Sequence, residues 1–134
     1  METTQDQKTK ITELTKKFQL KLVVVFGSFA TGKQRKDSDL DIAVLGMKDV
    51  FFKEHVDLIN ELSAIFNKEV DLTILNKANP LLSFQVSKNP ILLYGDRRDL
   101  LKFKLNAFKI YHNYAPFFEM ERKLNKKIIS TYAR

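Results

Sequence analysis

The stretch Leu22–Leu45, LVVVFGSFATGKQRKDSDLDIAVL, decides the fold of this 134-residue chain. A run of five apolar residues leads into Gly27-Ser28, and after ten further residues Asp39 and Asp41 open a second apolar run. Short apolar runs bounded by glycine and charged residues are typical of buried strands. The stretch therefore predicts a strand, a tight turn and a second strand.

The acidic pair is the first candidate for chemistry. Because side chains alternate along a strand, we expect Asp39 and Asp41 to share one face about 6 to 7 Å apart. Leu40, Ile42 and Val44 then point to the other face, into a core. Two unscreened carboxylates at that distance repel by roughly 3 kcal/mol at an effective dielectric near 20. A divalent cation removes this cost, so we interpret the pair as a metal site.

The turn supplies the second half of the predicted site. Gly27 lets the backbone bend sharply and approach a ligand closely. Ser28, at the start of a short helical turn, offers its hydroxyl and nearby N–H groups to an anion. A phosphate beside a metal-binding acid pair predicts a nucleoside triphosphate site.

A phosphate-binding P-loop is the competing interpretation of the same residues. The segment Gly27–Lys33, GSFATGK, matches the first seven positions of G-x-x-x-x-G-K-[ST], but Gln34 stands where the magnesium-binding hydroxyl belongs. A P-loop also runs directly into a long helix, whereas KQRKDSD has no helical apolar spacing. We therefore favour the acid-pair interpretation.

The spacing of Gly-Ser, ten residues and Asp-x-Asp after an apolar strand resembles that of the nucleotidyltransferase superfamily built on the DNA polymerase β palm. In its small size the chain resembles the minimal nucleotidyltransferases (MNT), which serve as antitoxins beside HEPN-domain toxins. The resemblance covers roughly residues 10–95. It implies an α/β (α+β) fold, with a mixed β-sheet and flanking helices.

The resemblance also assigns roles to three acids, which would be catalytic and would hold Mg²⁺: Asp39, Asp41 and Asp71. Asp71 lies in the predicted strand 69–75, EVDLTIL, and joins the pair if the two strands are neighbours. The alternative is an edge-strand charge that keeps the sheet soluble. Together with the upstream motif, the catalytic interpretation is favoured.

Nucleotide binding shows one departure from the family. By the resemblance, ATP places its phosphates against Gly27 and Ser28, in a motif that commonly reads Gly-Ser-x-Ala-Arg-Gly. This chain has Thr31 in the arginine position. If the arginine helps to hold phosphates, then nearby cations have to replace it, and the candidates are Lys33, Arg35 and Lys36.

Composition sets the broad class. The chain is 44% hydrophobic and 29% charged, which is ordinary for a protein that buries a core, and we expect one domain over residues 1–134. No apolar run is long enough for a membrane span, no secretory signal is recognisable, and cysteine is absent, so a reducing cytoplasm is the expected setting. The net charge of +7 is spread along the chain, and nucleic acid is not expected as a direct substrate.

The remaining elements follow from local sequence pattern. Helical spacing predicts helices over 5–18 and 49–67. Cap-like residues and a proline suited to a first helical turn predict a helix over 76–89, and the short run that ends at Gly95 predicts an edge strand over 91–94. A C-terminal helical arm of about 96–134 follows the catalytic core of about 10–95, and Pro116 is expected to kink or restart it. Six aromatic residues lie between Phe103 and Phe118, more than one small sheet needs, which favours a protein contact.

The resemblance implies a specific function. The chain would be an antitoxin that transfers AMP from ATP to a tyrosine hydroxyl of a cognate HEPN ribonuclease, and would assemble with that toxin as a hetero-oligomer. No residues are left for an acceptor-binding domain, so another protein must bring the acceptor. Two alternatives stay open: an antitoxin that acts by binding alone, and a nucleotidyltransferase for small molecules such as aminoglycosides.

Overall fold

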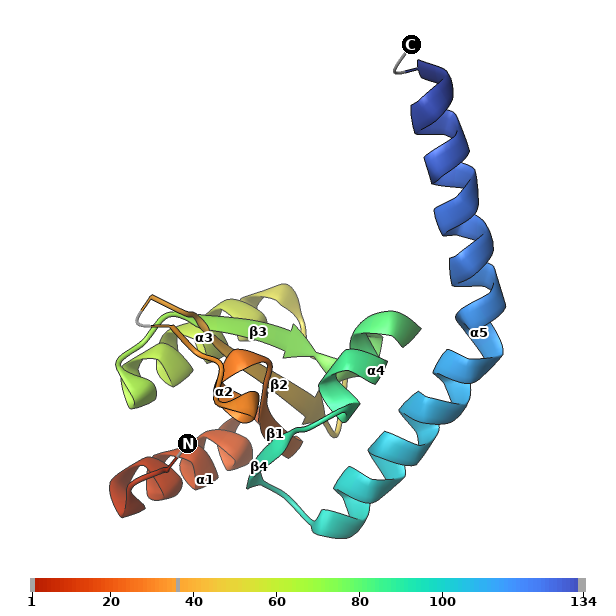
Figure 1. Ribbon diagram of the computed structural model, residues 1–134. Coiled ribbons are helices and arrows are strands. Elements are labelled where there is room, and N and C mark those ends of the chain that lie inside the picture. Colours follow the sequence, from red (N-terminus) through yellow and green to blue (C-terminus); the bar gives the residue numbers. More distant parts are fainter. Residues whose placement is uncertain (1, 36, 133–134) are drawn as a thin grey trace.

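The computed structural model describes residues 2–35 and 37–132, and its body is one sheet between helices (Figure 1). The elements in chain order are α1 (Gln5–Phe18), β1 (Leu20–Phe26), α2 (Ser28–Thr31), β2 (Leu40–Gly46), α3 (Phe52–Phe66), β3 (Val70–Ile74), the 3₁₀ turn η1 (Leu75–Lys77), α4 (Pro80–Ser87), β4 (Ile91–Tyr94) and α5 (Arg97–Tyr132). The strand order is β3-β2-β1-β4, with β2 and β3 parallel and the other pairs antiparallel. The predicted mixed sheet with flanking helices is confirmed.

The parallel pair β2–β3 fixes the geometry on which the site depends. Asp41 lies opposite Asp71 in the ladder. Beyond the last paired residues, the side-chain amide of Asn76 continues the ladder: Gly46 N donates to its Oδ1 at 2.8 Å, and its Nδ2 donates to Gly46 O at 2.9 Å. The amide thus takes the place of a further backbone pair and holds the two strands together where β3 ends.

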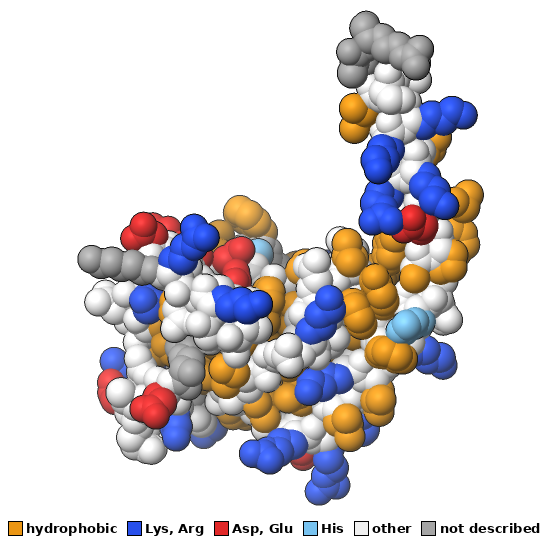
Figure 2. All heavy atoms as spheres, viewed as in Figure 1, with side chains coloured by type: hydrophobic (Ala, Val, Ile, Leu, Met, Phe, Trp, Pro, Cys, Tyr) orange, Lys and Arg blue, Asp and Glu red, His pale blue; other side chains and the backbone are white. Residues whose placement is uncertain are grey.

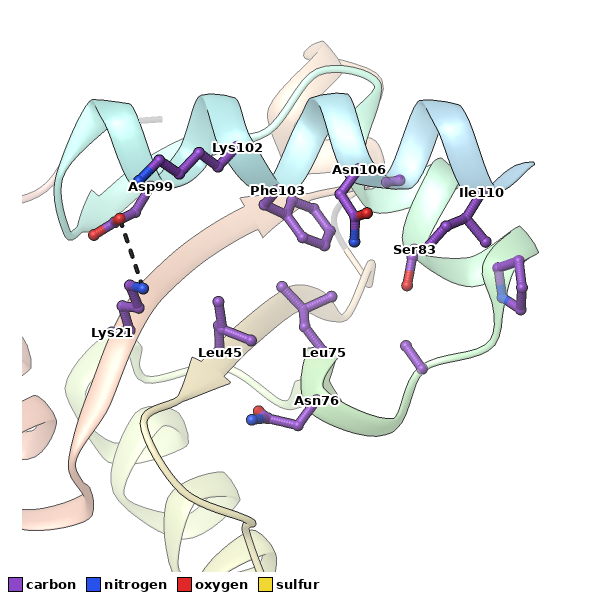
Figure 3. A pocket seen from close by; sticks show the side chains of 13 residues that line it. Lys21, Leu45, Leu75, Asn76, Ser83, Asp99, Lys102, Phe103, Asn106 and Ile110 are labelled. Atoms are coloured by element: carbon purple, nitrogen blue, oxygen red, sulfur yellow. Dashed lines mark ion pairs between the residues drawn. The ribbon is translucent and has the colours of Figure 1, made fainter. Parts of the chain in front are cut away.

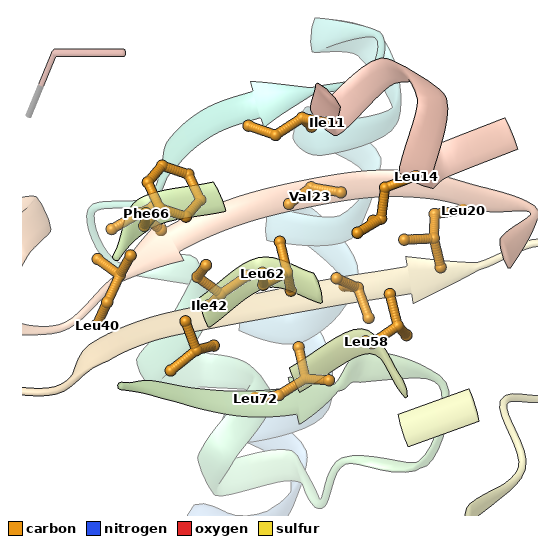
Figure 4. Packing of buried hydrophobic residues seen from close by; sticks show 13 residues of the cluster. Ile11, Leu14, Leu20, Val23, Leu40, Ile42, Leu58, Leu62, Phe66 and Leu72 are labelled. Carbon is orange, nitrogen blue, oxygen red and sulfur yellow. The ribbon is translucent and has the colours of Figure 1, made fainter. Parts of the chain in front are cut away.

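The larger part of the core lies between the sheet and the helices α1 and α3 (Figure 4). Each helix contributes one apolar stripe, Ile11 and Leu14 from α1 and Leu58 and Leu62 from α3, and all four side chains are at most 4% exposed. Burying a leucine or isoleucine side chain stabilises a fold by roughly 1.5–3 kcal/mol. Thr4 starts α1 with a capping box that also uses the side chain of Gln7. The helix spans 5–18 as predicted.

The opposite face of the sheet is covered by α4 and the first half of α5 (Figure 1). The apolar cluster there is smaller, with Val24, Ala43, Leu75 and Val86 buried. The chain predicted as one helix over 76–89 forms η1 and then α4. The reason is local, because the Asn79 side chain accepts from Leu82 N and Pro80 occupies the first turn, which starts a new helix there.

The C-terminal helix α5 begins beside Asp96, whose Oδ1 accepts from Arg98 N at 2.8 Å. The helix is continuous through Pro116, and Figure 1 shows it changing direction near its middle. The predicted restart of the helix is therefore wrong, whereas a kink agrees with the proline's missing N–H. Residues 119–131 are all exposed. Within the described ranges, no helix has both the length and the apolar character needed to cross a bilayer.

Candidate active site

The three predicted acids meet where β2 and β3 begin. Asp41 is the second residue of β2, Asp39 immediately precedes that strand, and Asp71 is the second residue of β3. Alternation along β2 places Asp41 on the same face as Ala43 and Leu45, which is the face covered by α4 and α5. The carboxylates lie beyond the covered area, with Asp39 and Asp71 exposed and Asp41 half-buried.

The electrostatics of Asp41 show how closely the acids approach. Burial raises the pKa of Asp41 above its ordinary value, and the negative charges of Asp71 and Asp39 raise it further. A side-chain hydrogen bond between Asp41 and Asp71 acts in the same direction. A carboxyl that shares its site with other carboxylates holds its proton more tightly. The acids therefore disfavour a further negative charge at Asp41, a penalty that a bound cation would remove.

The glycine turn lies directly against these acids. Gly27 has φ +71°, a conformation that L-residues with side chains rarely adopt, and a Cβ built on it would collide with Oδ2 of Asp41. Only glycine lets the turn pass so close to the carboxylate. The following helix α2 has four residues and ends at Gly32, so no long helix follows the turn. The structure thus agrees with rejecting the P-loop.

A cavity of about 350 Å³ opens beside the turn, lined by Phe26, Gly27, Ser28, Thr31, Lys33, Gln85, Lys88 and Asn89. Of the predicted cations, Lys33 faces this cavity. Arg35 is not among its lining residues, and its backbone N–H donates to Ser38 Oγ at 2.7 Å. Lys36 lies outside the described residues. The roles proposed for these side chains in nucleotide binding remain predictions.

Lys88 is a candidate that the sequence motifs did not identify. It follows α4 and lies just before β4, which pairs antiparallel with β1 so that Ile91 stands opposite Val25. That pairing brings the residues before β4 to the end of β1, next to the glycine turn. The Lys88 ammonium also lies 5.0 Å from the centre of the Phe84 ring, which limits its freedom. Lys88 could have been identified from the sequence only if the pairing of β1 with β4 had been predicted.

A larger cavity of about 630 Å³ lies at the other end of the sheet (Figure 3). It is lined by the beginning of β1, the end of β2 and one side of α5, including Lys21, Leu45 and Phe103. Lys21 Nζ lies 3.7 Å from Asp99 Oδ1 across it. Because β1 and β2 are antiparallel, this cavity and the carboxylates are separated by the length of the strands. Its size alone assigns it no chemistry.

The donor set fits a hard divalent cation that arrives with a nucleotide. Among residues 2–35 and 37–132, the acids, histidines and cysteines form no ready-made group of three or more metal ligands. Magnesium commonly takes only one or two protein carboxylates and completes its shell with water and substrate phosphates. Asp39 and Asp41 provide such oxygens beside the glycine turn. Their role as ligands, and that of Asp71, remains a prediction.

Comparison with known sequences places this geometry among nucleotide-transferring proteins. The family model described as polymerase beta, nucleotidyltransferase matches residues 9–99. The protein adenylyltransferase MntA of Shewanella oneidensis is 31% identical over 94 residues, which are 70% of this chain and 68% of MntA. The matched region contains the glycine turn and all three acids.

Solved structures extend the similarity beyond the catalytic body. A chain of a toxin–antitoxin complex with AMP-PNP matches with a TM-score of 0.75 and 28% identity, covering 87% of this chain and 97% of that one. A chain of the complex between tri-AMPylated Shewanella oneidensis HEPN toxin and MNT antitoxin matches with a TM-score of 0.70 and 26% identity, covering 90% and 97%. Since α5 begins at Arg97, coverage of this extent includes part of α5.

Proposed function

The chain belongs to the polymerase β nucleotidyltransferase family, and from this premise we propose that it is an antitoxin that transfers AMP from ATP to a tyrosine hydroxyl of a cognate HEPN-family toxin. One observation carries the proposal: Asp39, Asp41 and Asp71 converge against Gly27 in a chain similar to MntA. Related structures contain AMP-PNP in one case and a tri-AMPylated HEPN toxin in another. They are the reason for proposing ATP as the donor and the toxin as the acceptor. A cytoplasmic location is part of the same proposal.

The glycine turn and two lysines would hold the triphosphate. Gly27 brings the backbone close to the acids, and the half-buried Ser28 adds a hydroxyl to the cavity wall. Lys33, which follows α2, and Lys88, which follows α4, both line this cavity. Two cations facing one small cavity offset the charge of bound phosphates. We propose that Lys33 and Lys88 contact the phosphates in place of the arginine that the family commonly has where this chain has Thr31.

Asp39 and Asp41 would hold Mg²⁺, whose requirement is part of the proposal. When bound, this ion supplies positive charge that neutralises the α-phosphoryl group and the departing pyrophosphate. Burial and the neighbouring acids raise the pKa of Asp41, so a proton and the ion compete for its carboxyl.

Asp71 is the acid best placed to meet the acceptor. Its side chain is exposed at the edge strand β3, whereas Asp41 is half-buried behind it. In the proposed step the tyrosine oxygen forms a bond to the α-phosphorus and the bond from that phosphorus to the β-phosphate bridge breaks. Pyrophosphate leaves, and Asp71 accepts the hydroxyl proton. The roles of the acids therefore differ.

The test is transfer of label from ATP to the partner. The chain is incubated with α-labelled ATP, Mg²⁺ and the HEPN-family protein encoded beside it, and the proteins are separated. We expect label on the HEPN protein and none when that protein's tyrosines are changed to phenylalanine. Neutralisation of the toxin without any label would favour an antitoxin that acts by binding alone. Pyrophosphate release with an aminoglycoside and no protein partner would favour the small-molecule enzyme.

A further inference from the structure

The two halves of α5 have different surroundings, and we call residues 97–116 its proximal half and residues 117–132 its distal half. The proximal half packs on the body: Phe103 joins the apolar cluster beneath α4, and Ala107 is 3% exposed. Tyr111 stacks on Phe84 of α4 with ring centres 3.9 Å apart. The apolar side chains on the inner side of this half are thus covered by the chain itself.

The distal half carries an apolar stripe that the described part of the chain leaves open. We define the distal stripe as the residues at steps of three and four along one helix face, Phe117, Met120, Leu124 and Ile128, which are 64%, 68%, 58% and 45% exposed. The spacing is that of a helix face built for a partner. Scattered apolar residues on a surface need no explanation, whereas a continuous stripe of this length marks a protein contact.

The charges around the stripe indicate what kind of partner fits. The distal half carries four basic residues, Arg122, Lys123, Lys126 and Lys127, against two acidic ones, Glu119 and Glu121. Glu119 is already paired with Arg122 at 2.6 Å. Figure 2 shows basic side chains gathered along the projecting part of the helix beside apolar ones. Helical spacing puts Lys123 and Lys127 one turn apart along one edge of the stripe. A second copy would bring the same positive charge to that edge, whereas an acidic surface complements it.

The position of the stripe relative to the acids gives it a role. Asp41 lies on the face of the sheet that α4 and α5 cover, so the carboxylates and the helix share one side of the molecule. The distal half leaves the body on that side and extends beyond it (Figure 1). Asp39 and Asp71 are exposed at the start of the strands, so a protein that extends from the helix across this side of the sheet can meet them.

We propose that the distal stripe is the docking surface for the protein that accepts AMP, and that this protein presents an apolar surface rimmed by aspartate and glutamate. The inference rests on the proposed function and adds the means by which the chain selects its protein substrate. Binding on the helix raises the effective concentration of the acceptor at the chain, so the stripe acts on acceptor affinity and not on the chemical step.

The test compares two double variants of exposed residues on α5 and measures acceptor binding and AMP transfer separately. The stripe variant is Phe117→Ala with Leu124→Ala, and the matched control is Leu101→Ala with Leu105→Ala, whose side chains are 56% and 61% exposed on the proximal half. Truncation of a central apolar anchor usually weakens binding by about tenfold or more. We expect the stripe variant to raise both the Kd and the KM for the HEPN-family acceptor by about that factor, with kcat at saturating acceptor and the KM for ATP unchanged.

The outcomes are distinguishable because binding is measured by calorimetry without ATP. If the wild-type chain binds the HEPN protein but transfers no AMP, the proposed activity fails, and loss of binding in the stripe variant still supports the docking surface. Equal affinity of the stripe variant and the control would overturn it. So would a wild-type dimer in light scattering that becomes monomeric in the stripe variant, since a second copy would then be the occupant. Lys123→Glu with Lys127→Glu should weaken binding and reduce its salt dependence.

Discussion

The beginning of the parallel strands and the distal half of α5 are opposite kinds of surface. At the strands, backbone pairing sets Asp41 opposite Asp71, so two acidic side chains are held side by side at a cost. Along the distal half, apolar side chains stand in solvent without a covering element in the described chain. The first arrangement is suited to a cation and phosphates, and the second to a protein. We infer that chemistry and recognition lie on separate elements and can be separated by mutation.

The largest expected effect breaks the chemistry and leaves recognition intact. Asp39→Ala with Asp41→Ala removes the proposed ligands of the cation, and we expect AMP transfer to fall by about a thousandfold or more. The Kd for the HEPN-family partner should stay within about twofold, because neither residue lies on α5. Label transfer and calorimetry measure the two quantities. Loss of binding in parallel with loss of transfer would contradict the separation.

A second variant tests how tightly the glycine turn is fitted to the acids. In Gly27→Ala the new Cβ meets the Asp41 carboxylate at positive φ, and we expect the free energy of unfolding to fall by about 2 to 3 kcal/mol. Gly32→Ala is the matched control, because Gly32 has φ +74° but open space around its Cβ position. It should cost only about 1 kcal/mol. If urea unfolding shows that Gly27→Ala and Gly32→Ala lower the free energy of unfolding equally, the collision with Asp41 is absent.

A smaller effect is expected from Lys88, which lines the cavity beside the glycine turn. Lys88→Ala should raise the KM for ATP by about five- to tenfold, which corresponds to one lost charge-assisted contact. The KM for the protein acceptor should not change. Lys77→Ala removes an exposed lysine on η1 that lines none of the cavities described above, and serves as control. Rescue by Lys88→Arg would support a charge contact with phosphate, whereas an unchanged KM in Lys88→Ala would exclude it.

The smallest effect concerns stability and pH. Since burial and neighbouring acids raise the pKa of Asp41, the folded chain holds this proton more tightly than the unfolded chain does. The resulting stabilisation is present at low pH and is lost as pH rises from the ordinary value of 3.8 through the raised pKa. Asp41→Asn should therefore raise the melting temperature of the metal-free protein at pH 7, with a smaller gain at pH 3.8, the ordinary value. A gain that does not grow with pH would contradict this.

Several features of the fold followed from local pattern. The helix over 5–18, the two central strands and the strand carrying Asp71 could be predicted because their apolar spacing matches their burial in the structure. The proximity of Asp71 to the pair needed one further condition, that β2 and β3 are neighbours. The motif resemblance supplied that condition, since spacing within a strand says nothing of which strands pair.

The features that were missed depend on contacts between distant segments. Lys88 lines the cavity beside the glycine turn only because β4 pairs with β1, and no residue near Lys88 in the sequence indicates that pairing. Arg35 was expected among the cations that replace the arginine absent at Thr31; it does not line this cavity, and its role stays a prediction. The cap-like residues and Pro80 correctly indicated a helix within 76–89, but it begins only at Pro80, after the Asn79 cap, because the residues before it form η1.

The pairing of Asp41 with Asp71 also determines which changes evolution can make in the intervening segment. The ladder aligns the two strands by hydrogen bonds and not by counting the residues of α3 and its loops, so insertions there leave both acids in place. Loss of a single residue inside β3, by contrast, turns every following side chain to the opposite face. Related sequences can therefore differ in the length of the crossover between β2 and β3. They must keep Asp71 at a position whose side chain lies on the same face of β3.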